Sequence, residues 1–520
     1  MEITGTSIIG FSRGNESDTT FTAFNPATGE AVEPNFYSAN LDELNKACEL
    51  AEWARIAYGK VSGKEKAIFL RQIADNIEAL GDVLIERATL ETGLSNARFV
   101  GERGRTCAGL RMFADLVEKG NWVDARIDTP NPNRHPLPKP DVRSMLRPLG
   151  TVAVFCASNF PLAYSVAGGD TASALAAGCP VIVNAHFAHP GTAELVGLAV
   201  SAAVKTCGLP EGVFSLIFSK GYEIGQNLVK NPHVKAVGFT GSRTGGRALM
   251  DIAANRSEPI PVYAEMSSVN PIFILPSAMH EKFEMIAGGL HASVTLGAGQ
   301  FCTKPGIVVF PETEETEVFT SKFEELISYT SQHPLLTEGI RNNFEKMSAE
   351  RNVEKVTAKN ELKGFEVNPS VFQTDAETFL SNPRLEDEIF GPTTLFVKSN
   401  KREELLQIAR QMEGQLTATI HGTPEDLLEY GDLIAILETK VGRLIFNGYP
   451  TGVEVGDAIV HGGPYPATSD SRTSAVGTHA IDRFCRYVCF QNFPNEALPD
   501  ELKDENPLGI KQMIDGKYSA

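Results

Sequence analysis

Between residues 148 and 255, short apolar runs alternate with helical segments, and this alternation restricts the chain to a small set of folds. The apolar runs cover residues 152–155, 181–183, 213–217 and 236–239, and the helical patterns cover residues 164–177, 191–206, 222–230 and 243–255. Strands that alternate with helices of this length predict a doubly wound α/β domain built on a parallel sheet. Such sheets bind ligands beyond the carboxyl ends of their strands, which here are residues 156–161 and 240–242.

A second alternating region follows and predicts a second α/β domain. Its helical patterns cover 279–296, 314–330, 338–358, 402–413 and 424–438, and its apolar runs cover 307–310, 394–397, 416–420 and 443–446. The opening of the chain is predicted to be largely helical, with helix starts after Asn40 and near Ser95. Residues 127–140 contain five prolines. That segment is predicted to be either a plain linker or a protruding strand pair used for subunit contact.

Composition excludes several classes of partner. The chain has 520 residues and a formal net charge of −18, which disfavours nucleic acid and anionic membranes. The most apolar stretch, 151–183, is interrupted by Asn159, Pro161 and Asp170, so no membrane span is predicted. No signal peptide is predicted at the N-terminus, and the eight cysteines fit no metal-binding spacing. We therefore expect reduced thiols, no metal site and a cytoplasmic location.

One cysteine lies in a segment rich in glycine. Cys302 falls within residues 297–306, between a helical pattern and the apolar run 307–310. It therefore lies on a connection, where side chains can face a cleft. A thiolate there could attack an electrophilic carbon. Taken alone, a single cysteine is more often a small buried apolar residue, so the local sequence leaves both roles open.

Three other segments carry side chains suited to catalysis. Asn159 follows a strand end, where its amide could donate to a developing oxyanion. Glu265 ends the run 261–264 and could act as a general base. Glu388 and Phe390 share a sharp turn and could hold a ribose and pack against a ring. The alternatives are that Asn159 is an ordinary turn asparagine, that Glu265 is a surface or capping glutamate, and that the turn with Glu388 and Phe390 is purely structural.

The turn from Gly238 to Gly246 joins a strand to a helix. Glycine permits close approach of a ligand, and amides at a helix N-terminus attract phosphate. An ordinary turn capped by Ser242 is equally compatible with the sequence. The G-x-G-x-x-G and P-loop patterns are absent after the predicted strands, so a dinucleotide would have to bind in another manner.

Taken in order, these segments resemble the aldehyde dehydrogenase superfamily over nearly the whole chain. Five motifs stand in the family's order: residues 159–161, 238–242, 264–266, 299–303 and 388–392. Other stretches are similar to one branch, the α-ketoglutaric semialdehyde (2,5-dioxovalerate) dehydrogenases and their NADP-dependent relatives. Those stretches are residues 185–192, 265–271, 461–468 and 506–509.

The resemblance implies a covalent mechanism. Cys302 would attack the aldehyde, and the Asn159 amide with the Cys302 backbone N–H would hold the oxyanion. Glu265 would then activate water, which implies release of a free acid because relatives that transfer the acyl group to coenzyme A generally lack this glutamate. The residues implied near the pyrophosphate and the nicotinamide ribose are Thr240, Gly241, Ser242, Gly246, Glu388 and Phe390.

The adenosine side departs from the family pattern. Asn184 stands where most relatives have a lysine that contacts the adenosine ribose, so a contact from Asn184 is expected in its place. Phe187 stands where NAD-preferring relatives often have a glutamate that repels a 2′-phosphate. His186 and Lys220 are candidates to bind such a phosphate, and NADP is favoured over NAD. Two further departures, Ser158 and Lys304, are expected to alter the substrate tunnel.

The resemblance implies an NAD(P)-dependent, non-acylating aldehyde dehydrogenase that oxidises α-ketoglutaric semialdehyde to 2-oxoglutarate. A medium- or long-chain fatty aldehyde is the alternative substrate, and a cation that pairs with the distal carboxylate would separate the two. A non-catalytic relative with a binding or structural role is the remaining alternative, prompted by Asn184. The retained Cys302, Glu265 and Asn159 argue against it.

The family architecture implies two doubly wound α/β domains and a small β element for oligomerisation. We expect a homodimer or homotetramer. The expected boundaries are 1–126 with 147–263 for the cofactor-binding domain, 264–482 for the catalytic domain, 127–146 with 483–497 for the oligomerisation element, and 498–520 for a C-terminal tail.

Overall fold

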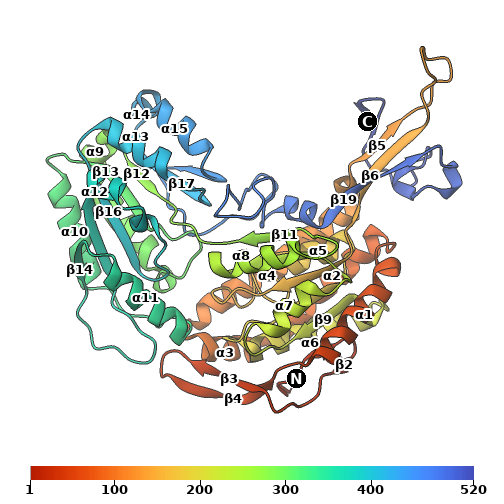
Figure 1. The fold of residues 1–520 in the computed structure, drawn as a ribbon, viewed down its shortest axis with the longest axis horizontal. Helices are drawn as coiled ribbons and strands as arrows, with labels where there is room; N and C mark the ends of the chain where they lie inside the picture. The colour runs from red at the N-terminus through yellow and green to blue at the C-terminus, as the bar shows by residue number, and fades with distance from the viewer. Residues whose placement is uncertain (1, 520) are drawn as a thin grey trace.

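The computed structural model describes residues 2–519. Two α/β parts lie side by side, and a small β-sheet projects from the part that contains the N-terminus (Figure 1). The seven-stranded sheet of the first part has the order β11-β10-β7-β8-β9-β1-β2. Its strands are β1 (Ile8–Ile9), β2 (Ser12–Arg13), β7 (Thr151–Phe155), β8 (Val181–Asn184), β9 (Phe214–Ile217), β10 (Val234–Thr240) and β11 (Val262–Glu265).

Strands β7 to β11 are parallel, as the alternating pattern predicts. The chain moves outward from β7 through β8 to β9 and then returns to β10 on the other side of β7. The carboxyl ends of β7 and β10 therefore flank a switch point in the sheet, where ligands of such folds bind. The connecting helices are α5 (Gly169–Ala177), α6 (Pro190–Thr206), α7 (Glu223–Lys230) and α8 (Arg243–Ala254).

The N-terminal region contains the expected helices and also strands that the sequence analysis missed. Helix α1 (Leu41–Tyr58) begins with a reciprocal capping box between Asn40 and Glu43, and Ser95 caps α4 (Asn96–Lys119). Helices α2 (Gly63–Ala79) and α3 (Gly81–Thr92) lie between them. Before α1, β1 extends the large sheet, and β3 (Thr20–Asn25) pairs with β4 (Glu30–Tyr37).

The second part has a seven-stranded sheet of order β14-β15-β16-β13-β12-β17-β18, parallel except for the edge strand β14. Its strands are β12 (Ile272–Ile274), β13 (Ile307–Pro311), β14 (Glu354–Thr357), β15 (Ser370–Asp375), β16 (Thr393–Ser399), β17 (Thr417–His421) and β18 (Arg443–Phe446). Its helices are α9 (Pro276–Thr295), α10 (Thr316–Ser328), α11 (Glu338–Glu350), α12 (Ala376–Ser381), α13 (Arg402–Gln411), α14 (Pro424–Glu429) and α15 (Gly431–Glu438).

Three predicted helices differ from the structure. Helix α5 begins at Gly169 rather than at residue 164, and α11 ends at Glu350, so that residues 354–357 are free to form β14. The predicted helix 424–438 is two helices separated by Tyr430. The hydrophobic spacing of these segments continues across the breaks, which is why the pattern alone overextended them.

The small sheet has the order β19-β6-β5-β20-β21. Its strands are β5 (Ala125–Asp128), β6 (Val142–Pro148), β19 (Cys485–Gln491), β20 (Gln512–Ile514) and β21 (Lys517–Tyr518). The proline-rich segment extends β5 and β6 into a protruding loop, so of the two open alternatives the strand pair is the one observed (Figure 1). Residues 512–514, expected in a tail, pair with β5 instead. Across residues 2–519, the chain contains no helix with both the length and the apolarity needed to cross a membrane.

Candidate active site

Cys302 lies on the loop between α9 and β13, and this loop is fixed by a buried asparagine. The Asn270 amide donates to the carbonyls of Cys302 (2.8 Å) and Lys304 (3.0 Å). Its oxygen accepts hydrogen bonds from the hydroxyls of Ser268 (3.0 Å) and Thr417 (3.1 Å). Asn270 is fully buried, so these bonds replace water that the site excludes. The loop that carries the thiol is therefore tied to the second sheet.

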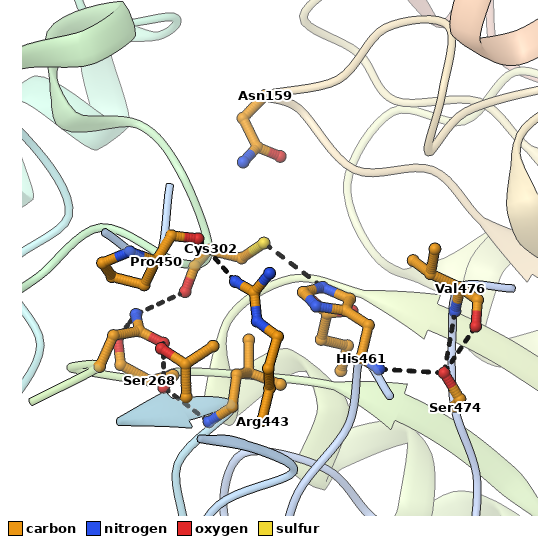
Figure 2. A network of polar contacts seen from close by, with 12 residues as sticks. Asn159, Ser268, Cys302, Arg443, Pro450, His461, Ser474 and Val476 are labelled. Atoms are coloured by element: carbon orange, nitrogen blue, oxygen red, sulfur yellow. Dashed lines mark hydrogen bonds and ion pairs between the residues drawn. The ribbon is translucent and has the colours of Figure 1, made fainter. Parts of the chain in front are cut away.

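A histidine stands between the thiol and a carboxylate. The Nε2 atom of His461 lies 3.6 Å from the Cys302 Sγ atom and 3.0 Å from the Glu265 Oε1 atom (Figure 2). Glu265 ends β11, and the His461 backbone N–H donates to the Ser474 hydroxyl over 3.0 Å. His461 and Glu265 are both buried. Strand β11 and the loop around residue 461 thus bring a base and an acid to the half-buried cysteine.

The electrostatics of this cluster disfavour a free thiolate. Burial, followed by the negative charge of Glu265, raises the pKa of the Cys302 thiol well above its usual range. Burial by itself would also raise the pKa of the Glu265 carboxyl, but His461, through its charge when it holds a proton and through its hydrogen bond, brings that pKa below its usual value. Glu265 is therefore a carboxylate at neutral pH, and Cys302 needs a proton acceptor to become a nucleophile.

Asn159 faces the cysteine from the first part of the molecule. It follows the end of β7, and in Figure 2 its side chain extends toward the side of the site where the Cys302 sulfur lies. One N–H of its amide donates to the Gln300 carbonyl over 3.0 Å. Since an amide nitrogen carries two hydrogens, the second can donate to a ligand beside the thiol.

The three reactive atoms also form a compact set of metal-type donors. One ligand atom each from Glu265, Cys302 and His461 lies within 4.8 Å of the other two. A carboxylate, a thiol and an imidazole at this separation can exchange protons and can also hold a soft divalent cation. The arrangement therefore supports nucleophilic chemistry on a carbon atom.

The turn with Glu388 and Phe390 is supported from beneath by Lys304. The Lys304 ammonium is buried and donates to the carbonyls of Ile389 (3.1 Å) and Thr393 (2.8 Å). Burial raises the pKa of the Glu388 carboxyl, while the nearby Lys304 charge opposes that rise. Lys304 was expected to alter the substrate tunnel. Its amine instead points into the protein and supports the turn, and Glu388 and Phe390 both remain partly exposed.

The segment from β10 to α8 lies directly beside Glu265. Thr240 is paired with Glu265 in the sheet register, and the Gly241 N–H donates to the Glu265 carbonyl over 3.0 Å. Ser242 caps α8 by accepting from the Gly245 N–H over 3.2 Å, and the N–H groups of Arg243 and Thr244 at the start of the helix are left for a ligand. Gly246 has a packing role, because a Cβ there would lie 2.7 Å from the sulfur of Met266.

The candidates for binding the adenosine side of the cofactor lie at the end of β8 (Asn184), just after it (His186) and after β9 (Lys220). The Asn184 side-chain oxygen accepts from the Ser219 hydroxyl over 2.8 Å, so its NH2 group is left to donate. His186 stacks on Phe187 with ring centroids 4.6 Å apart, and burial lowers the His186 pKa to about 3. The ring is therefore neutral at physiological pH. Lys220 and Phe187 line one surface cavity together.

Sequence reasoning missed the position of His461. The motif 461–468 contributed to the branch resemblance, but no local pattern pairs a histidine with a cysteine 159 residues away. The available signal was a histidine followed by two glycines, in a chain that already offers a candidate nucleophile and a candidate base.

Comparison with known proteins agrees with this geometry. Residues 13–486 match the family described as "Aldehyde dehydrogenase family". The chain is 47% identical to the alpha-ketoglutaric semialdehyde dehydrogenase 2 of Azospirillum brasilense, over 99% of this chain and 100% of the relative. It is 44% identical to the alpha-ketoglutaric semialdehyde dehydrogenase of Acinetobacter baylyi, over 92% of each.

Solved structures share the fold at low sequence identity. A lactaldehyde dehydrogenase superposes with a TM-score of 0.81 at 20% identity, covering 94% of this chain and 99% of that one. An aldehyde dehydrogenase C variant from Pseudomonas syringae, solved with NAD+ and octanal, gives a TM-score of 0.79 at 20% identity, covering 94% and 97%. With the family match across most of its length and two relatives above 40% identity, the chain belongs to the aldehyde dehydrogenase family and is an aldehyde-oxidising enzyme that uses a nicotinamide cofactor.

Proposed function

We propose that this enzyme oxidises α-ketoglutaric semialdehyde to 2-oxoglutarate. The contact of Cys302, His461 and Glu265 carries the proposal, because it joins a nucleophile to a base beside the cofactor turn. The substrate follows from the names of the two relatives at 47% and 44% identity, whose similarity extends over 92% or more of this chain.

The first half of the reaction needs the thiol proton removed. His461 Nε2 is 3.6 Å from the sulfur, so the proton passes into the His461–Glu265 pair as the sulfur bonds to the aldehyde carbon. The aldehyde oxygen becomes an oxyanion that the free N–H of Asn159 and the Cys302 backbone N–H stabilise. A bound nicotinamide supplies the hydride acceptor that turns this adduct into a thioester.

The second half of the reaction needs an activated water. Glu265 is a buried carboxylate whose Oε2 atom has no hydrogen-bond partner among the described residues. This oxygen can accept a proton from water as the water attacks the thioester. The C–S bond then breaks, the acid leaves, Cys302 regains one proton from the His461–Glu265 pair, and the second proton held by that pair passes to solvent.

The cofactor is proposed to be NADP in preference to NAD. The switch point between β7 and β10 and the N-terminus of α8 offer the turn and amides that a pyrophosphate requires. Phe187 places no negative charge near a 2′-phosphate. Because the His186 ring is neutral, Lys220 is the cation proposed to bind that phosphate, and His186 contributes a hydrogen bond at most.

The assembly is proposed to be a homodimer or homotetramer formed through the small sheet. Its edge strand β19 has an unpaired side, and such an edge accepts a further strand. A cytoplasmic location is proposed because the mechanism requires a reduced Cys302.

The test is a set of initial rates with three aldehydes, each run with NAD and with NADP. The aldehydes are α-ketoglutaric semialdehyde, hexanal and a long-chain aldehyde, and a Cys302→Ala variant is the control. The proposal predicts the highest kcat/KM for the semialdehyde with NADP and no activity in the control. A preference for hexanal or the longer aldehyde would preserve the mechanism and overturn the substrate. Inactivity with every pair would favour the non-catalytic alternative.

A further inference from the structure

Helix α4 presents a charged face to the loop that carries Asn159. Arg98, Glu102 and Arg105 are spaced by four and three residues and therefore share one side of the helix. The buried Glu102 carboxylate accepts from the backbone N–H groups of Leu162 (2.9 Å) and Ala163 (3.0 Å). This carboxylate anchors the loop, and it also sets which of the two arginines is neutralised.

Arg98 is the arginine that Glu102 neutralises. The two side chains form an ion pair of 3.1 Å, and Arg98 also donates to the Asn159 carbonyl over 3.4 Å. The guanidinium of Arg105 has no such partner. It lies over the rings of Phe160 (5.9 Å to the centroid) and Tyr164 (5.8 Å), and within residues 2–519 no ion pair or hydrogen bond engages it.

Arg105 and Tyr164 line the same cavity. Gly109, Gly169 and Val476 also border it, and a Cβ added at Gly109 would meet nothing within 4 Å, so the glycine leaves open space there. Among the described residues, the Tyr164 hydroxyl likewise has no hydrogen-bond partner. Two residues with unengaged donors, one of them cationic, therefore line one cavity, and such a pair of donors can bind a carboxylate.

This cavity adjoins the reactive cluster. The Tyr164 ring lies 6.3 Å from the His461 ring, and the Phe160 ring lies 5.3 Å from that of Phe301, next to Cys302. The positive charge of Arg105 is also close enough to oppose the rise in the pKa of Cys302. Tyr164 thus borders the cavity of Arg105 and also lies near His461, which places the guanidinium and the thiol in neighbouring parts of the site.

Most other charges around this space are paired. Asp170 forms an ion pair of 2.7 Å with Arg483, and Glu102 is engaged by Arg98. Arg443 has no acidic partner among the described residues and donates to the carbonyls of Pro450 (2.7 Å) and Gly452 (3.3 Å). Of the two cations without an acidic partner, Arg105 is the one that borders the cavity.

We infer that Arg105 and Tyr164 form the subsite for the distal carboxylate of the substrate, and that this subsite selects short aldehydes with a terminal acid group. The inference rests on the proposed function and adds the residues that recognise the substrate class. Arg105 acts in specificity, with its planar fork matched to a carboxylate and its face stacked on two aromatic rings. The chemical step itself remains with the Cys302 cluster.

The experiment compares three five-carbon aldehydes: α-ketoglutaric semialdehyde, glutaric semialdehyde (which lacks the ketone) and pentanal (which lacks the acid). Each is tested with wild type, Arg105→Met, Arg105→Lys and a control, Arg103→Met. Arg103 lies on the same helix, but its guanidinium donates to the Gly81 carbonyl over 3.0 Å. Loss of a charge-assisted hydrogen bond predicts that Arg105→Met lowers kcat/KM for both acids about 10- to 150-fold, mainly through KM.

For pentanal, kcat/KM in Arg105→Met is expected to stay within about twofold of wild type, because pentanal has no carboxylate for Arg105 to bind. Arg105→Lys is expected to fall between wild type and Arg105→Met for the acids, and Arg103→Met is expected to match wild type. An equal loss for pentanal and the acids in Arg105→Met would show a structural role and overturn the inference. Unchanged selectivity would also overturn it. A wild type that prefers pentanal would refute the proposed function instead.

Discussion

Replacing His461 by glutamine tests whether the imidazole carries the proton that leaves the thiol. Glutamine keeps a polar group near the Glu265 carboxylate but cannot accept a proton. The imidazole is 3.6 Å from the sulfur and 3.0 Å from the carboxylate, so both contacts change together. A positioned general base contributes on the order of 10²- to 10⁴-fold to a rate. The expected loss is therefore about 2.7–5.4 kcal/mol of transition-state stabilisation.

The loss should fall on the first half of the reaction. Rapid mixing of enzyme, NADP and aldehyde would give a burst of reduced cofactor whose rate constant reports hydride transfer. We expect His461→Gln to slow this burst about 10²- to 10⁴-fold at pH 7. Raising the pH should partly restore it, because the pKa of Cys302 is raised and hydroxide then generates the thiolate directly. In wild type, the same rise in pH should increase the burst rate constant only slightly, because the base is present.

A burst rate constant within twofold of wild type would refute this reasoning. It would show that Glu265 deprotonates the thiol without help and that His461 only fills space. A slow burst with no recovery at high pH would also contradict it, because that result points to a misplaced cysteine rather than to a missing base. Iodoacetamide labelling of Cys302 at high pH separates these cases.

Three further predictions follow from the same geometry. Glu265→Gln should leave a burst of reduced cofactor but stop steady-state turnover. It should also move the pH profile of Cys302 alkylation to lower pH, because the Glu265 charge raises the pKa of the thiol. An alkylation profile that stays at the wild-type pH would contradict this electrostatic argument. Zn²⁺ should inhibit wild type in competition with aldehyde and the inhibition should be reversed by EDTA, since the Sγ, Nε2 and carboxylate atoms lie within 4.8 Å of one another; an unchanged affinity of Cys302→Ala for Zn²⁺ would place the metal elsewhere. Lys304→Met should displace the Glu388 turn and thereby raise KM for the cofactor by up to about 100-fold. An unchanged KM would show that the turn keeps its conformation without Lys304.

The parallel sheets could be predicted because their strands are buried on both faces. Such strands appear as unbroken apolar runs, as in β8 and β13, where nearly every side chain is inaccessible. Strands of two or three residues leave no such pattern. Strands β1 and β12 were missed for this reason, although β12 lies inside the second sheet, between β13 and β17.

The residues of the candidate site also differ in how far the sequence could predict them. Cys302 and Glu265 lie in short segments with glycine or strand-end context, so local sequence and family resemblance pointed to them. The local signal at His461, a histidine before two glycines, does not reveal its partners, and Arg105 has no local signal, because their contacts form only when distant segments meet. The contacts of Lys304 with the turn at Ile389 could not be predicted, since sequence cannot tell which way a side chain on a tight loop points. The charge of a buried lysine is satisfied by backbone carbonyls that no pattern reveals.

Asn270 joins the carbonyls of Cys302 and Lys304 to β17 of the second sheet, whereas Arg105, Phe160 and Tyr164 belong to the first part of the molecule. The sulfur atom and the proposed substrate-selecting surface therefore belong to different parts of the molecule, while Glu265 and Asn159 reach the sulfur from the first part. Under the inferred role of Arg105, its substitution would change which aldehyde is accepted without moving the loop that carries Cys302. A chain built this way can acquire new substrates while its chemistry stays unchanged.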